Sequence, residues 1–423
     1  MYKIILFFIV SIFFISCSKP IPPSPSQKTF ADEDTYIVFA LRAEEVGSFN
    51  TAGKLFEKLY VKSQKKEYLY RSLSNYMSAS EFDKVIKKVD YYNEKETDIK
   101  LLRFKVLALL HKKQYNKAKD LALKLVKLTS ASEDYLLTAQ TYLKLKNYKM
   151  AIKYLDSAYH KEYNPTILDQ ISIILYMNLQ DPKEAIARLE THLRMFGCNE
   201  IICQRLLSFY SKQNNVDGML SVYKKFYKMT KNEAVLEKIL QIYIYKKDYF
   251  GLKEFLEQSG ANDEMLLELY ASQKELKKAS KIAYKLYDKT LDIKYLAQGS
   301  IYEFESLKKK DKKTLKKIIN NLKKVIQEDN SALYLNYLGY IMIDENIDIK
   351  EGMEYIKKAL KQKPKSAYYL DSLAWGYYKL GKCKKSYRLF KKIKKLEGGN
   401  DPEITKHIKV VKKCLNKKNK RKK

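Results

Sequence analysis

The stretch that decides the fold lies near the end of the 423-residue chain: Ser366–Leu396, SAYYLDSLAWGYYKLGKCKKSYRLFKKIKKL. Counted from Ala374, offsets of three, twelve and sixteen residues hold in turn a large, a small and a large side chain: Tyr377, Ser386 and Phe390. Small residues are needed where two helices approach closely, and large ones fill the gap between neighbouring helices. The spacing therefore indicates a pair of packed helices.

The same spacing recurs along most of the chain. Positions equivalent to Ala374, called anchors below, follow at steps of 33 or 34 residues at first and of 27, 72 and 35 residues later: Ala40, Leu73, Val106, Ala139, Ile173, Leu207, Leu240, Leu267, Gly339 and Ala374. Met219 and Leu252 replace the small residue twelve positions after their anchors, so we expect looser packing in those two units. The 72-residue step leaves room for one degenerate unit near residues 290–330.

This pattern resembles the tetratricopeptide repeat, a 34-residue helix–turn–helix unit. In the quoted stretch, the core positions of that motif are held by Leu373, Ala374, Tyr377, Gly381, Ser386 and Phe390. Tyr334–Pro364 is also similar, with one extra residue in its inter-helix turn. The resemblance implies an all-α fold, a right-handed α-solenoid of about eleven units over residues 35–396. A capping helix over residues 397–415 would shield the last apolar face.

Composition agrees with a helical chain. Glycine (13 residues) and proline (8 residues) together make up about 5% of the sequence, where roughly 12% is usual. A sandwich, a barrel or a doubly wound sheet needs turn residues every ten or so positions, and this chain lacks them. Hydrophobic residues make up 46% of the chain, so the high charge does not indicate disorder.

The amino terminus is typical of an exported protein. Lys3 precedes an apolar run over residues 4–15, which is too short to span a bilayer as a helix and is typical of a secretory signal. Residues 14–17, Phe-Ile-Ser-Cys, resemble a bacterial lipobox. That resemblance implies a signal peptide over residues 1–16 and a covalent lipid on Cys17. The alternative is an ordinary signal peptide with an incidental cysteine.

Residues 17–34 form the predicted tether. Four of the eight prolines fall here: Pro20, Pro22, Pro23 and Pro25. Such a stretch is an extended, semi-rigid spacer that would hold a folded body off a membrane. Ser18, directly after the cysteine, resembles lipoproteins released to an outer membrane. We therefore expect a protein that is anchored by its lipid to a bacterial membrane, specifically the outer membrane, and that faces the periplasm.

Four further cysteines follow Cys17, and three pairings are possible among them: Cys198, Cys203, Cys383 and Cys414. Export permits disulfides, and free, partly buried thiols are the alternative. The Cys198–Cys203 loop is the shortest, and a Cys383–Cys414 bond would fasten the last helix to its neighbour. The spacings fit no zinc pattern.

Enzyme signatures are absent from the sequence. The four histidines are scattered among different units, and His192 stands where a core residue belongs. We therefore predict a non-enzymatic protein with no catalytic residue, no metal and no cofactor apart from the lipid on Cys17.

The tetratricopeptide resemblance implies recognition of protein segments in a groove lined by the first helix of each unit. By position, eight residues should face that groove: Asn336, Tyr340, Asp344, Tyr368, Asp371, Trp375, Tyr378 and Lys379. Trp375 is the only tryptophan, and tryptophan and tyrosine are enriched at binding hot spots. Asp371 and Asn336 could bond a partner's backbone. The alternative is that Tyr368 and Trp375 pack against a neighbouring helix while Asp371 braces a loop.

The formal net charge is +33, and much of it lies late in the chain. Residues 379–423 hold 19 basic and 3 acidic residues, and residues 416–423 form a basic tail. Nucleic acid, anionic lipid headgroups and plain solvation compete as explanations. Export makes nucleic acid the least favoured of the three.

Together, these features predict a membrane-anchored extracytoplasmic scaffold that binds partner proteins, in the assembly of a cell-envelope complex. The alternative, if the chain is not exported, is a basic helical-repeat protein that binds nucleic acid or ribonucleoprotein.

Overall fold

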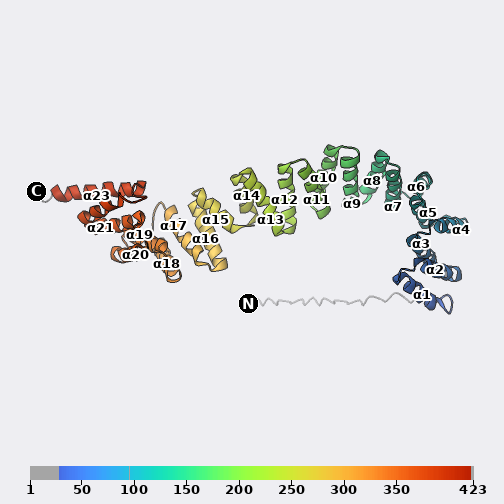
Figure 1. Ribbon diagram of the computed structural model, residues 1–423, viewed down its shortest axis with the longest axis horizontal. Coiled ribbons are helices and arrows are strands. Elements are labelled where there is room, and N and C mark those ends of the chain that lie inside the picture. Colours follow the sequence, from blue (N-terminus) through green and yellow to red (C-terminus); the bar gives the residue numbers. More distant parts are fainter. Residues whose placement is uncertain (1–27, 95, 421–423) are drawn as a thin grey trace, which may run out of the picture. The chain divides into compact units, whose positions relative to one another are not determined.

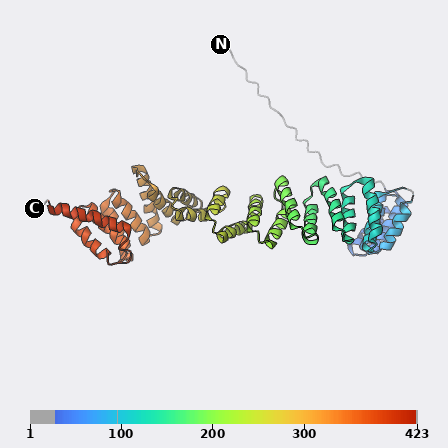
Figure 2. The ribbon, with the colours of Figure 1, turned by 90° about the horizontal axis from the view of Figure 1, so that it is seen from above.

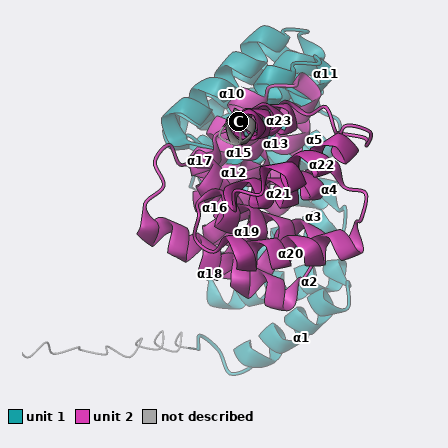
Figure 3. Ribbon diagram, turned by 90° about the vertical axis from the view of Figure 1, so that its left-hand side faces the viewer, with its two compact units in different colours: residues 1–226 teal, residues 227–423 magenta. Residues whose placement is uncertain are grey.

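The computed structural model describes residues 28–94 and 96–420, without the side chains of residues 417–420. The predicted signal peptide, Cys17, most of the tether and the end of the basic tail lie outside this part of the chain. The chain divides into two compact units, unit 1 through Phe226 and unit 2 from Tyr227 (Figure 3).

Unit 1 is a series of helices in chain order (Figure 1). They are α1 (Glu33–Glu45), α2 (Phe49–Ser63), α3 (Lys66–Ser78), α4 (Phe82–Tyr92), α5 (Ile99–His111), α6 (Tyr115–Thr129), α7 (Ser132–Lys144), α8 (Tyr148–Glu162), α9 (Pro165–Ile173), the π-helical turn η1 (Ile174–Asn178), α10 (Pro182–Phe196) and α11 (Glu200–Lys212). Helix α12 (Val216–Thr230) contains the boundary between the units.

Unit 2 continues in the same manner. Its helices are α13 (Glu233–Lys246), α14 (Tyr249–Ser259), α15 (Asp263–Ser272), α16 (Leu276–Thr290), α17 (Ile293–Ser306), α18 (Lys312–Glu328), α19 (Ala332–Asp344), α20 (Ile349–Gln362), α21 (Ala367–Lys379), α22 (Cys383–Ile393) and α23 (Pro402–Lys420). Throughout the described residues the regular structure is helical, without a strand. This confirms the predicted all-α class.

Within each repeat, an odd-numbered first helix pairs with the following even-numbered second helix as a hairpin. Figures 1 and 2 show the two helices of such a hairpin side by side. The anchors lie on the first helices, and the small residues twelve positions later lie on the second helices. Ala40, Ala52, Ala374 and Ser386 are all fully buried at these two positions. The sequence spacing thus marks the contact between the helices of each hairpin.

One left-handed residue closes nearly every hairpin. Seven positions after each of the ten anchors, the backbone φ lies between +52° and +71°: Gly47, Ser80, Lys113, Lys146, Gln180, Asn214, Lys247, Lys274, Asn346 and Gly381. In nine of them, the next N–H returns to the carbonyl three residues after the anchor, as in Lys382 N to Tyr377 O at 2.9 Å. This is the Schellman ending of a helix. Eight of the ten are not glycine, so most turns carry a conformation that L-residues adopt rarely.

The irregular steps have local causes. The step of 34 residues from Ile173 to Leu207 contains the π-turn η1, where the Leu179 N–H reaches the Ile174 carbonyl five residues back. The 27-residue step corresponds to the two short helices α14 and α15. The hairpin α17–α18 occupies the stretch near residues 290–330, and the linker between its helices has no left-handed residue of this kind.

Two repeats have a large side chain in place of the small residue twelve positions after the anchor. Met219, on α12, is only partly buried, whereas Leu252, on α14, is 2% exposed. The expected looser packing is visible in the partial burial of Met219 and, around Leu252, in the wider approach of α13 and α14 compared with α7 and α8, where the same position is alanine. The α19–α20 hairpin is the tightest, because a Cβ on Gly339 would lie 2.5 Å from the Gly352 carbonyl oxygen.

Helix α23 covers the last hairpin. Ile404, Ile408 and Val411 of α23 pack with Phe390 and Ile393 of α22 in one buried cluster. The helix begins at Pro402 and continues to Lys420, so it starts and ends about five residues later than the 397–415 range expected from sequence. Residues 394–401 form turns instead, and a Cβ at Gly399 would overlap the Ile393 carbonyl oxygen.

Candidate functional site

A cavity of about 650 Å³ opens in unit 2 on the side of the first helices α17, α19 and α21, and the start of α23 borders it. We call it the cap cavity. Its lining residues are Phe304, Glu305, Lys310, Leu333, Asn336, Tyr337, Tyr340, Asp344, Lys363, Ser366, Tyr368, Tyr369, Asp371, Ser372 and Glu403. Five of the eight residues predicted to face a groove are among them: Asn336, Tyr340, Asp344, Tyr368 and Asp371.

Trp375 is placed differently from the groove prediction. It is 9% exposed, and its ring stacks on His407 of α23 with centroids 4.0 Å apart. Its Nε1 donates to Asp344 Oδ1 at 3.0 Å. The packing alternative therefore describes Trp375, because docking of α23 covers the face of α21 that carries it.

Tyr378 and Lys379 also lie outside the cap cavity lining. Tyr378 stacks on Trp375, with ring centroids 4.7 Å apart. Lys379 Nζ donates to the Asp344 carbonyl oxygen at 2.7 Å, and so fastens the end of α21 to the end of α19. The Tyr378 stack lies within α21, the Lys379 bond joins two first helices, and both side chains are partly buried. Tyr368, in contrast, is 53% exposed at the cavity.

Asp371 is engaged by the capping helix. His407 Nδ1 lies 3.0 Å from both carboxylate oxygens of Asp371, and the two residues are 8% and 6% exposed. Burial raises the pKa of Asp371, and the contact with His407 works in the opposite direction. Asp371 thus braces α23 against α21, which is close to the alternative of bracing a loop.

The hydrogen-bond acceptors of the cap cavity are incompletely used. The Oδ1 atom of Asn336 is buried and has no hydrogen-bond partner in the structure. Glu403 accepts from the Tyr340 hydroxyl at 3.0 Å, and Glu305 accepts a long bond from the Tyr337 hydroxyl at 3.4 Å. A buried acceptor without a donor costs free energy, so a donor entering here would satisfy it.

Two glutamates lie in the cap cavity without a basic partner. In the described part of the chain, Glu305 and Glu403 form no ion pair within 4.0 Å. Glu305 is exposed as a whole residue, but partial desolvation of its carboxyl raises the pKa; the hydrogen bond from Tyr337 lowers it, and the nearby charge of Glu403 raises it further. Burial likewise raises the pKa of Tyr337 to about 12 and moves the pKa of Tyr340 upward.

Sequence reasoning missed four residues of this region: Glu305, Tyr337, Glu403 and His407. Tyr337 sits one position after Asn336 and could have been found by a closer reading of α19. Glu305 and Glu403 are 98 positions apart, and only the stacking of α17, α19, α21 and α23 brings them to one cavity. His407 carried no signal beyond its place in the predicted cap.

A second cavity, of about 440 Å³, lies in unit 1 against helices α8, α9 and α10. We call it the arginine cavity. Its two carboxylates are both paired, since Arg188 lies 2.6 Å from Asp156 and 2.7 Å from Glu184. Nearby, the predicted core histidine His192 is 2% exposed and lies 2.8 Å from the Tyr159 hydroxyl through Nδ1. Burial lowers its pKa.

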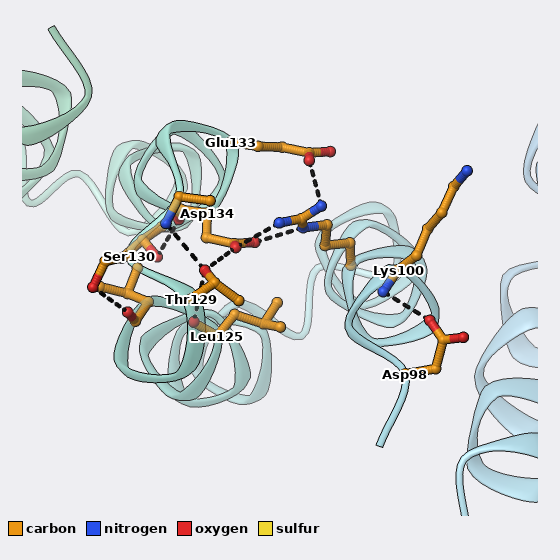
Figure 4. Close-up of polar contacts among 11 residues, drawn as sticks. Asp98, Lys100, Leu125, Thr129, Ser130, Glu133 and Asp134 are labelled. Carbon is orange, nitrogen blue, oxygen red and sulfur yellow. Dashed lines mark hydrogen bonds and ion pairs between the residues drawn. The ribbon is translucent and has the colours of Figure 1, made fainter. Parts of the chain in front are cut away.

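Buried carboxylates elsewhere in unit 1 are also satisfied. Asp134 is fully buried and accepts two bonds from Arg103, at 2.8 and 2.7 Å. Asp134 also accepts a hydrogen bond from the Thr129 hydroxyl, and Glu133 pairs with the same arginine. Figure 4 shows Thr129, Glu133 and Asp134 around the guanidinium group. The arginine and the hydroxyl hold the pKa of Asp134 below its usual range, against the opposing effect of burial.

The structure pairs Cys198 with Cys203 and Cys383 with Cys414, one of the three possible connectivities. Their Cα atoms are 5.9 and 6.1 Å apart, within the range of disulfides. Of the described helices, none has the length and apolar character needed to cross a membrane. The described side chains also include no group of three or more His, Cys, Asp or Glu suited to a metal ion.

Comparison with known proteins gives one sequence relative. No family model matches the chain. A TPR repeat-containing protein of Pseudomonas aeruginosa, PA4667, is 32% identical over 84 residues, which are 20% of this chain and 14% of that protein. The match thus covers about a seventh of the relative's length.

Among solved structures, MamA from Desulfovibrio magneticus RS-1 matches 40% of this chain and 97% of its own at 15% identity, with a TM-score of 0.34. The APC/C hetero-tetramer Cut9–Hcn1 matches 91% of this chain and 84% of its own at 11% identity, with a TM-score of 0.33. The recurring hairpins, their anchors and the sequence relative agree. The chain is an all-α series of helix hairpins closed by a capping helix, and over 84 residues it is similar to a TPR repeat-containing protein.

Proposed function

We propose that this protein is a lipid-anchored, extracytoplasmic scaffold that binds a partner protein in the cap cavity. It performs no catalysis of its own in this proposal. The observation that carries the proposal is the cap cavity itself, where first helices of three successive hairpins bring carboxylates, the Asn336 amide and tyrosine rings to one space. Aromatic side chains beside polar groups are the usual chemistry of protein recognition.

Export is supported by two independent features. The residues around Cys17 resemble a lipobox and precede a proline-rich spacer. The remaining four cysteines fall into two pairs at bridging distance, an arrangement that suits an oxidising compartment. Both features fit a protein that leaves the cytoplasm, and a role in assembling a cell-envelope complex is the part of the proposal that rests on analogy alone.

The lipid anchor is tested by metabolic labelling with an alkyne palmitate. Wild-type protein should take up the label and fractionate with membranes, and Cys17→Ala should lose both properties. The double variant Cys198→Ala/Cys203→Ala is the matched control, because it removes thiols elsewhere and should keep the label. Equal labelling of Cys17→Ala and wild type would refute the anchor. Soluble protein that binds nucleic acid with steep salt dependence would instead favour the nucleic-acid alternative.

Partner binding is tested by photo-crosslinking in intact cells. A photoreactive residue at Leu333, which lines the cap cavity and is 49% exposed, should capture a defined partner. The same residue at Leu291, 72% exposed and outside the cavity, is the control. Identical crosslinked species from both positions, or none from Leu333, would contradict the cap cavity as the binding site.

A further inference from the structure

The cap cavity also indicates the chemistry of its partner, on the basis of the function proposed above. We infer that the cap cavity binds the cationic side chain of an arginine or lysine in a partner protein, held between Glu305 and Glu403 and beside Asn336. The groups that would contact the side chain are acceptors and aromatic rings, and they come from the four helices α17, α19, α21 and α23.

The cap cavity is lined by more acidic than basic side chains. Four carboxylates line the cap cavity, those of Glu305, Asp344, Asp371 and Glu403, against two lysines, Lys310 and Lys363. Asp344 and Asp371 are already used, by Trp375 and Lys379 and by His407. Lys310 is used as well, since its Nζ lies 2.7 Å from Glu345. Glu305 and Glu403 are left facing the cavity as negative charges without a cation.

Other carboxylates of the chain do have basic partners. Basic residues outnumber acidic ones by 82 to 49, so a carboxylate has many potential partners. Asp134, Asp156 and Asp169 each meet an arginine. Two neighbouring glutamates that repel one another are unfavourable unless something positive comes between them.

Asn336 lines the same cavity, and its Oδ1 atom is buried without a donor. A guanidinium carries five N–H donors and an ammonium three, and neither has an acceptor. Either group could bond the two glutamates together, and also Asn336 once its amide turns toward the ligand. An anionic or purely acceptor group could satisfy none of them.

Tyrosine rings make up much of the rest of the cavity lining. Tyr337, Tyr340, Tyr368 and Tyr369 all line the cap cavity. A cation over a tyrosine face gains about 0.5–2 kcal/mol, more as it is desolvated. The tyrosines therefore favour the same kind of ligand as the carboxylates.

The described part of the protein's own basic tail lies away from the cavity. Glu403 is in the first turn of α23, which is helical through Lys420. At 1.5 Å per residue, that end of the helix is about 26 Å from Glu403. We therefore assign the cation to a different protein.

The test measures peptide binding by fluorescence anisotropy to the full chain purified in detergent. The probe is a labelled peptide, Ser-Gly-Arg-Gly-Arg-Gly-Ser, and its control has citrulline, the neutral counterpart of arginine, at both arginine positions. We expect the arginine peptide to bind at least about tenfold more tightly than the citrulline peptide. Equal binding of the two peptides would overturn the inference.

Variants assign the effect to the cavity. Glu305→Gln/Glu403→Gln should abolish the preference for arginine, while Glu328→Gln/Glu354→Gln removes two exposed charges elsewhere and should preserve it. Lys363→Ala removes a positive charge from the cavity and should tighten binding. Circular dichroism of each variant separates loss of binding from loss of folding. Equal loss in both double variants would refute the site.

Two further outcomes separate the inference from the function on which it rests. Capture of a partner from Leu333 together with no arginine preference would leave the scaffold proposal standing and overturn the cation site. Concentration-dependent self-association that Glu305→Gln/Glu403→Gln abolishes would overturn the assignment to a different protein, because the basic tail of a second copy would then be the ligand.

Discussion

The arginine cavity of unit 1 and the cap cavity of unit 2 are built from the same repeat but differ in how their charges are balanced. In the arginine cavity, Arg188 pairs with both Asp156 and Glu184. In the cap cavity, Glu305 and Glu403 meet no cation within 4.0 Å in the described structure. A hollow between helices is therefore not by itself a binding site. In our proposal, the unpaired carboxylates are what distinguish the cap cavity from the arginine cavity.

The largest effect is expected at the contact that holds Glu403 in place. His407→Ala removes the partner of buried Asp371 and the ring beneath Trp375. Breaking a buried pair by removing one partner costs about 3 kcal/mol, so α23 should detach from α21. Hydrogen exchange should show lost protection in α21–α23, while the arginine cavity remains protected.

His160→Ala is the matched control, because His160 borders the arginine cavity and is exposed. It should change hydrogen exchange little anywhere. If His407→Ala were equally silent, the Asp371–His407 contact would not be what docks α23.

The next prediction concerns a substitution that leaves the carboxylates of the arginine cavity unpaired, as they are in the cap cavity. Arg188→Met leaves Asp156 and Glu184 without their cation, and we expect a loss of about 1 kcal/mol because all three groups are partly exposed. The variant should also gain affinity for the arginine peptide. Thermal unfolding and anisotropy measure the two changes, with exposed Arg194→Met as the control. A variant that loses stability without gaining affinity would show that unpaired carboxylates alone do not make the site.

Much of the fold could be predicted because the repeat records helix contacts directly in residue size. The anchors and the small residues twelve positions later met as expected, and the all-α class followed. The turns could be found only in part, since only Gly47 and Gly381 among the ten left-handed residues are glycines. Serine, lysine, glutamine and asparagine at the other eight carry no such signal, because the Schellman hydrogen bonds impose the conformation.

The candidate site was harder to predict. Trp375 stands on the first-helix face that should line a groove, yet α23 covers it through His407. Sequence indicates that a cap exists but not which side chains it covers. Glu305 and Glu403 come together only through the stacking of successive hairpins, a long-range effect with no local pattern.

A smaller effect concerns the cost of keeping the cap cavity unpaired. Glu305→Gln removes one of two neighbouring negative charges, so the unliganded protein should become more stable at pH 7. Since Glu305 is an exposed residue, the gain should not exceed about 0.5 kcal/mol. Denaturant unfolding measures it, with Glu397→Gln, exposed and outside the cavity, as the control. A loss of stability would mean that Glu305 has a favourable partner in the free protein.

The last comparison concerns the sign of the pH dependence of stability, which should differ between a paired and an unpaired glutamate. Lys65, Tyr68 and Thr29 bond Glu33 and lower its pKa from 4.5 to about 2. Its contribution to stability is therefore full above pH 4.5 and is lost as the pH falls through about 2. The advantage of wild type over Glu33→Gln should disappear across that range.

Glu305 should behave in the opposite way. Burial and Glu403 raise its pKa above 4.5, so its ionised form destabilises the fold, and protonation removes that cost as the pH falls through the raised pKa. The advantage of Glu305→Gln over wild type should therefore vanish on mild acidification, where Glu33 is still ionised. Carbon-13 NMR of labelled glutamate carboxyls, assigned with the two variants, measures both titrations. If Glu305 titrated below 4.5, a cation would already lie beside it, and the contrast between the two cavities would fail.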